Sequence, residues 1–164
     1  MEFKGGIHST KNVGFHNNFQ KINETGLQTA YKSDNKVHVD GDTMFIAGTM
    51  NKQDLIDDFT KIPFYGDVRQ SQRYTDVIET VKKNPNVKKV VGHSLGGSVA
   101  LELEKSMPNT YETTTYGAPV ISFKGGNRYR HRNDIVSAFD FGAKSVGFII
   151  NPIEAHSFQN YEYD

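Results

Sequence analysis

The sequence of 164 residues contains no cysteine and carries no net charge. Without cysteine there is no disulfide, no thiolate nucleophile and no cysteine-type zinc site. Because 19 basic residues balance 19 acidic ones, the charge gives no reason to expect a nucleic acid partner. No apolar run approaches membrane-spanning length, and the first residues lack the apolar core of a signal peptide. We therefore expect a single soluble domain over residues 1–164, cytoplasmic by default, with a core of its own.

The most informative stretch runs from Val87 to Glu104 and reads VKKVVGHSLGGSVALELE. An apolar run rich in valine passes into Gly-His-Ser-Leu-Gly, and small and aliphatic residues at helical spacing follow. Strand, G-x-S-x-G and helix in this order predict a sharp turn that presents Ser94 as a nucleophile. A chance match in a chain of this length has odds of roughly one in twenty, so an idle serine in a glycine-rich turn is the alternative.

Strand and helix patterns alternate along the chain, which predicts an α/β fold with a mostly parallel central sheet flanked by helices. Residues 1–26 are rich in glycine and asparagine, and we expect them to be irregular. Helices are expected over 51–59, over 67–83 with Asp67 as N-cap, and after Ser94. The expected strands are 27–32, 36–39, 43–47, 87–91, 111–116, 128–131 and, as a strand or packed loop, 145–150.

A nucleophilic serine needs a base that takes its proton. Two histidines follow Ser94 in the sequence, His131 and His156. The alternating pattern around His131 makes it a residue of a strand, whereas His156 follows a loop and can reach the carboxyl edge of the sheet. We therefore expect His156 to be the base.

The base in turn needs a carboxylate that orients it. Asp134 directly follows a strand, where rigid placement is available, and we favour it for this reason. The chain order Ser94, Asp134, His156 is also the order found in α/β-hydrolases. The weaker candidates are Asp140, Glu112 and Glu154.

From about Thr43 to Tyr161, the chain resembles the class 3 (fungal-type) lipases of the α/β-hydrolase superfamily, in a shortened form. Five segments carry the resemblance in order: TMFIAGT, VVGHSLGGSVA, TTTYGAPV, RYRHRNDIVSAF and AHSFQNY. The specific part is the combination of GHSLGG with RND-IV. The resemblance implies a compact α/β-hydrolase-like fold with a minimal lid.

The resemblance also implies the roles of individual residues. Ser94 is implied as nucleophile, Asp134 as orienting acid and His156 as general base. The backbone amides of Thr49 and Leu95 are implied as the oxyanion hole, with help from the Thr49 hydroxyl. One departure concerns position 47, where alanine replaces the arginine that usually precedes Gly-Thr in the family, so a structural ion pair is lost.

We expect the chain to cleave carboxylic esters through an acyl-serine intermediate, without a cofactor or metal ion. The expected substrates are lipid esters, either acylglycerols or phospholipids, and this implies peripheral contact with a lipid surface. The candidate substrate contacts are Met50, His93, Phe64 and Tyr65, although most amphipathic faces of this kind pack into the core.

Two alternatives use the same residues differently. A short-chain esterase or an acyltransferase would keep the triad and change the substrate. A catalytically silent hydrolase fold would serve as an interaction module, although such a protein has no need of the intact Ser, Asp and His. Labelling of Ser94 by a fluorophosphonate separates these hypotheses.

Overall fold

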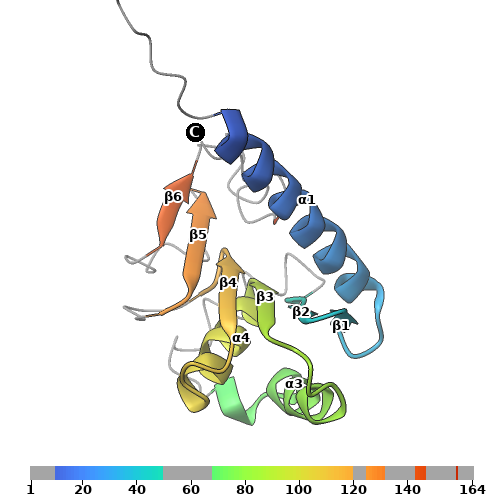
Figure 1. The fold of residues 1–164 in the computed structure, drawn as a ribbon. Coiled ribbons are helices and arrows are strands. Elements are labelled where there is room, and N and C mark those ends of the chain that lie inside the picture. Colours follow the sequence, from blue (N-terminus) through green and yellow to red (C-terminus); the bar gives the residue numbers. More distant parts are fainter. Residues whose placement is uncertain (1–9, 50–67, 120–124, 132–142, 147–157, 159–164) are drawn as a thin grey trace, which may run out of the picture.

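The computed structural model describes residues 10–49, 68–119, 125–131, 143–146 and 158. Within these ranges six strands form one sheet, in the same order as along the chain (Figure 1). They are β1 Val37–Asp40, β2 Thr43–Ile46, β3 Lys89–His93, β4 Glu112–Tyr116, β5 Asn127–His131 and β6 Lys144–Val146. β1 runs antiparallel to β2, and every other neighbouring pair is parallel. The expected α/β class with a mostly parallel sheet is thus confirmed.

Helices cover both faces of this sheet (Figure 1). They are α1 Thr10–Lys32, the short 3-10 helix η1 Val68–Gln70, α3 Gln72–Lys83 and α4 Leu95–Ser106. α1 lies on one face, whereas α3 and α4 pack on the other. In the described part of the chain, no helix combines the length and the apolar character that crossing a bilayer requires.

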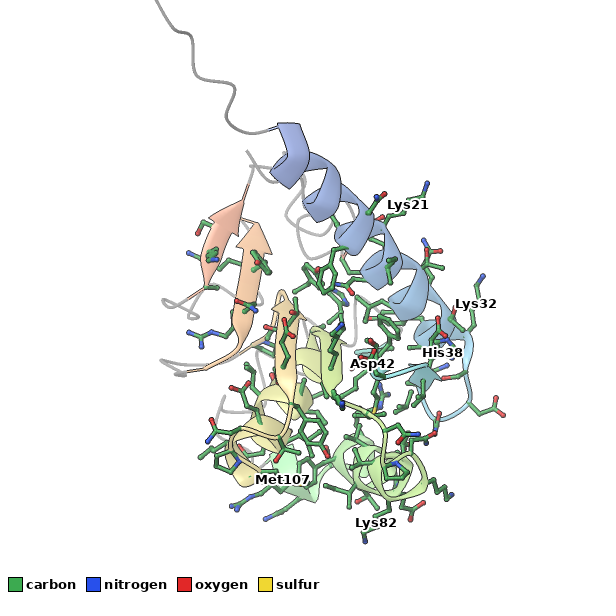
Figure 2. All side chains as sticks on the ribbon, viewed as in Figure 1. Lys21, Lys32, His38, Asp42, Lys82 and Met107 are labelled. Carbon is green, nitrogen blue, oxygen red and sulfur yellow. The ribbon has the colours of Figure 1, made fainter. Side chains whose placement is uncertain are left out.

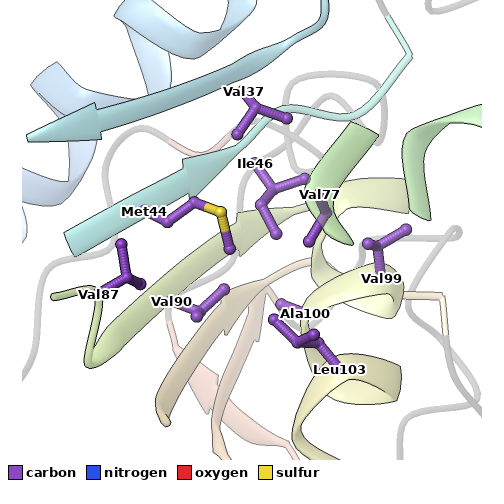
Figure 3. Close-up of a cluster of buried hydrophobic side chains, with 9 residues drawn as sticks. All are labelled: Val37, Met44, Ile46, Val77, Val87, Val90, Val99, Ala100 and Leu103. Carbon is purple, nitrogen blue, oxygen red and sulfur yellow. The ribbon is translucent and has the colours of Figure 1, made fainter. Parts of the chain in front are cut away.

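The face below α3 and α4 holds the larger apolar cluster. Alternate residues of β2 and β3 point to this side, and they meet the apolar stripes of the two helices (Figure 3). The fully buried members of the cluster are Met44, Ile46, Val77, Val90, Val99, Ala100 and Leu103. This packing fixes α4 directly behind the end of β3.

The opposite face is covered by α1, which corrects two of the expectations from the sequence. Residues 10–26 are helical rather than irregular, and residues 27–32 continue the same helix instead of forming a strand. Leu27 and Ala30 are fully buried against Phe45 and Val91 of the sheet. Burying a leucine side chain contributes roughly 1.5–3 kcal/mol, so this packing outweighs the weak helix propensity of the glycines and asparagines.

The polar side of α1 faces away from the sheet. Lys21 and Lys32 are exposed there, and their side chains project outward (Figure 2). On the inner side, buried Asn23 donates a hydrogen bond of 2.9 Å from its side-chain nitrogen to the hydroxyl of Tyr116 on β4. The helix is therefore amphipathic, although asparagine and glycine replace some of the apolar residues that reveal such a face in a sequence.

Helix α3 also begins later than expected. Its N-cap is Ser71, whose hydroxyl oxygen accepts a hydrogen bond of 3.1 Å from the Tyr74 amide. Asp67 is therefore not the N-cap, because η1 precedes the helix. The expected end is confirmed, since the amide of Asn84 donates to the carbonyl of Thr80 at 3.0 Å. The helix expected over 51–59 lies outside the described residues.

Gly26 tests the contact between α1 and the sheet. A Cβ at this position would overlap the ring of buried Phe45. Alanine raises helix propensity by about 0.8–1 kcal/mol relative to glycine, whereas overpacking costs about 1–3 kcal/mol. We therefore expect Gly26→Ala to lower the free energy of unfolding in urea by up to about 2 kcal/mol.

The matched control is Thr29→Ala at an exposed position of the same helix. This variant gains propensity without a clash and should be neutral or slightly stabilising. Stabilisation by both substitutions would contradict the packing of α1 on Phe45.

Candidate active site

Ser94 is the single residue between β3 and α4, as the G-x-S-x-G pattern predicts. Its backbone has φ 54° and ψ −127°, a conformation that residues with a Cβ seldom adopt. The side chain is only 1% exposed. Among the described residues, its Oγ has no hydrogen-bond partner. The turn thus holds a buried serine with a strained backbone at the carboxyl end of a central strand.

Glycines let three backbone segments come together around this serine. A Cβ at Gly92 would overlap the carbonyl oxygen of Gly96, and one at Gly96 would overlap the carbonyl oxygen of Ile46. A Cβ at Gly48 would lie 2.7 Å from the Cβ of Ser94. Contacts this short do not occur, so β3, α4 and the end of β2 can pack this closely only with glycine at these positions.

The loop after β2 therefore lies beside Ser94, because β2 and β3 are parallel neighbours. It comprises residues 47–49, which we call the Gly48 loop. Leu95 is the first residue of α4, and its amide has no acceptor within the helix. The structure thus brings together Ser94, Leu95 and the Gly48 loop, which includes Thr49. Their roles as nucleophile and oxyanion hole stay predictions.

The other predicted site residues fall elsewhere. Asp134 and His156 lie outside the described residues, as do Met50, Phe64 and Tyr65. The competing histidine, His131, is the last residue of β5. Its place in a strand, which argued against it as the base, is thus confirmed.

His93, a candidate substrate contact, is buried next to two aromatic side chains. Its ring is 5% exposed, and its Nδ1 lies 2.5 Å from the hydroxyl oxygen of Tyr31 on α1. Phe158 packs edge-on against the His93 ring and stacks on Tyr31, with centroid distances of 5.2 and 5.4 Å. Aromatic side chains thus pack on the His93 ring, and its contact with substrate stays a prediction.

Tyr31 also contacts the Gly48 loop, since the amide of Gly48 donates to its hydroxyl oxygen at 3.1 Å. The same hydroxyl is also hydrogen-bonded to His93 Nδ1, with the donor set by the tautomer of the imidazole. Burial raises the pKa of Tyr31 to about 12, and the Gly48 amide and Arg73 offset the rise only in part. Tyr31 is therefore a neutral phenol near neutral pH.

Arg73 of α3 reaches the same loop from the opposite layer of the fold. Its Nη1 donates to the carbonyl oxygens of Ala47 and Gly48, the second at 3.3 Å. Burial lowers the pKa of Arg73, while Tyr31 and Asp76 act in the opposite direction. An arginine nevertheless keeps its charge in proteins. Position 47, where arginine usually precedes Gly-Thr in the class 3 lipases, is alanine in this chain. The guanidinium of Arg73 nevertheless reaches the Gly48 loop from α3.

Neither Tyr31 nor Arg73 was found from the sequence. Tyr31 fell in a segment assigned to a strand, where its position relative to Ser94 could not be inferred. Arg73 stood in the first turn of an amphipathic helix, where an arginine ordinarily faces solvent. Only the packing of α1 and α3 against the sheet brings both residues to the Gly48 loop.

The raised pKa of Tyr31 predicts a loss of stability at alkaline pH. The folded state holds the phenol proton up to about pH 12, whereas the unfolded chain releases it near 10.0. The stabilisation is complete below pH 10 and is lost as the pH rises towards 12, by roughly 2–3 kcal/mol at most. Denaturation in urea at intervals between these values measures it.

Tyr31→Phe should show a shallower decline over the same range, because it lacks the titrating group. Burial also raises the pKa of Tyr111, but that residue is present in both proteins and cancels in the comparison. If the free energy of unfolding falls equally with pH in wild type and in Tyr31→Phe, folding does not raise the pKa of Tyr31.

Comparison with protein-family models, curated proteins and solved structures gave no match to this chain. The resemblance to the class 3 lipases therefore depends on the five sequence segments alone. The geometry adds that one of them, GHSLGG, forms a strand–turn–helix with strained Ser94 at the turn. The fold class is α/β, and the assignment to a hydrolase is a proposal.

Proposed function

We propose that the chain is a serine carboxylic-ester hydrolase that acts on lipid esters through an acyl-Ser94 intermediate. One observation carries the proposal, namely the buried hydroxyl of Ser94 on a strained turn between β3 and α4, without a hydrogen-bond partner among the described residues. Such strain costs of order 1–3 kcal/mol and is commonly found at functional sites.

In the proposed reaction, the Oγ of Ser94 attacks the ester carbonyl and His156 takes the hydroxyl proton. Asp134 orients His156 and stabilises the imidazolium that forms. The carbonyl oxygen becomes an oxyanion, which the amides of Leu95 and Thr49 would stabilise near the positive end of the α4 dipole. His156 then gives the proton to the leaving alcohol, and water hydrolyses the acyl-serine by the same steps in reverse order.

The choice of lipid esters depends on the segment that follows the Gly48 loop. Residues 50–65 contain Met50, Leu55, Phe59, Ile62 and the pair Phe64 and Tyr65. This segment lies outside the described residues. Its position immediately after Thr49 means that it should border the acyl group of an ester held at Ser94.

The proposed nucleophile can be tested with a fluorophosphonate probe, which forms a covalent bond with an activated serine. Wild type should be labelled, whereas Ser94→Ala should lose both labelling and ester hydrolysis while it unfolds at an unchanged temperature. His156→Ala should be about as inactive as Ser94→Ala, because the residues of a triad act as a unit. His131→Ala is the matched control and should retain activity.

Two results would contradict this proposal. Absence of labelling in a folded wild type would favour the catalytically silent fold. Loss of activity in His131→Ala, with activity retained in His156→Ala, would overturn the choice of base.

The substrate class can be tested with p-nitrophenyl esters from C2 to C16. Each additional methylene that is buried contributes about 0.8 kcal/mol. Two or three buried methylenes should therefore raise kcat/KM by about one to two decades over the acetate. An optimum at C2, with no turnover of micellar phospholipid or triglyceride, would favour the short-chain esterase instead.

A further inference from the structure

The Gly48 loop is held by side chains from two different helices. Tyr31 of α1 accepts a hydrogen bond from the Gly48 amide, and Arg73 of α3 donates to the carbonyls of Ala47 and Gly48. The carbonyl of Ala47 and the amide of Gly48 belong to the same peptide unit. Arg73 therefore binds this unit at one end and Tyr31 binds it at the other, which fixes the orientation of the peptide plane.

In the part of the chain that the structure describes, only one end of the next peptide unit is hydrogen-bonded. It consists of the carbonyl of Gly48, which accepts from Arg73 at 3.3 Å, and the amide of Thr49. A trans peptide is planar, and its C=O and N–H point in opposite directions. Because Arg73 fixes the direction of the Gly48 carbonyl, the Thr49 amide must point away from Arg73. This is the amide expected to donate to the oxyanion.

The positive charge of Arg73 also favours hydrogen-bond donation by the Thr49 amide. A cation on a carbonyl oxygen draws electron density toward that oxygen, and hydrogen-bonded groups in a chain polarise one another. The N–H of the same peptide unit becomes a better donor. Arg73 is half-buried, so water screens this effect less than it would at the surface.

Tyr31 connects the loop to the turn that carries Ser94. Its hydroxyl lies between the Gly48 amide at 3.1 Å and His93 Nδ1 at 2.5 Å, and His93 directly precedes Ser94. One hydroxyl thus sets the distance between the Gly48 loop and the nucleophile. Phe158 stacks on Tyr31 and keeps the phenol ring in this orientation.

We propose that Arg73 and Tyr31 are positioning residues that orient the Thr49 amide toward the oxyanion formed at Ser94. The inference rests on the proposed function, because it assigns to both residues a part in the same reaction. Neither residue touches the substrate. Their effect is to hold one hydrogen-bond donor in place before the charge develops, which is the arrangement that stabilises a transition state.

The inference predicts a specific kinetic pattern. Tyr31→Phe and Arg73→Met should each lower kcat for a p-nitrophenyl ester about tenfold to a hundredfold, because a donor misplaced by about 1 Å costs up to that much. KM should stay within about twofold, since the donor acts on the transition state more than on the bound ester. Arg73→Lys keeps a cation that can donate to one carbonyl and should recover most of kcat.

The double variant Tyr31→Phe/Arg73→Met adds a test of common action. Both residues hold the same peptide unit, so the combined loss of kcat should be smaller than the product of the two single losses. The matched control is Tyr74→Phe, which removes a phenol hydroxyl next to Arg73 in sequence. That hydroxyl contacts Ser106 at 3.2 Å on the surface, and kcat should not change.

A second measurement does not depend on activity. Amide hydrogen exchange by NMR should show the Gly48 amide exchanging at least about tenfold faster in Tyr31→Phe than in wild type, because its acceptor is gone. Unchanged exchange at Gly48 would overturn the inference whether or not the protein hydrolyses esters. Wild-type kcat in both single variants would overturn the inference and leave the proposed function standing. An inactive wild type without fluorophosphonate labelling would overturn the proposed function. It would also overturn the role of Tyr31 and Arg73 as positioning residues for the reaction.

Discussion

The closeness of three backbone segments around Ser94 is the constraint on which the site depends. The end of β2, the end of β3 and the first turn of α4 approach so closely that a single Cβ at Gly92 or Gly96 would overlap a carbonyl oxygen. This approach brings the Gly48 loop to Ser94. The strained backbone of Ser94 persists because the surrounding packing leaves it no room to relax.

Helices on both faces of the sheet hold this arrangement in place. α4 presents its first amides to the region next to Ser94, and the apolar cluster with Val99 and Leu103 holds that helix against the sheet. α1 and α3 contribute polar side chains instead, Tyr31 and Arg73, which reach the Gly48 loop from opposite faces. Apolar packing thus sets the positions of the helices and strands, and hydrogen bonds orient the peptide groups of the Gly48 loop.

The sequence predicts those parts of the structure that local patterns determine. The turn at Ser94 was predicted because its glycines, its preceding valines and its following helix are all adjacent in the chain. The helix α1 was not predicted, because Asn23 and Gly26 occupy inner positions where a pattern search expects apolar residues. Their fit depends on Tyr116 and Phe45, which are distant in sequence. The pairing of Arg73 with the carbonyls of Ala47 and Gly48 was likewise inaccessible, since it depends on how α3 packs.

The hydrogen bond between Asn23 and Tyr116 also has a consequence for the order in which the molecule assembles. The two residues are separated by 93 positions, so α1 leaves the ribosome long before the strand that it contacts. During synthesis the apolar face of α1 has no partner until β2 and β3 have emerged and paired. Contacts of such long range form slowly, because a long loop must close before they contribute any free energy. The β3–α4–β4 unit is local by comparison, and the hydrogen bond from Asn23 can form only after β4 has joined the sheet. A nascent chain stalled before β4 would therefore have β2 and β3 for the apolar face of α1 but no acceptor for buried Asn23.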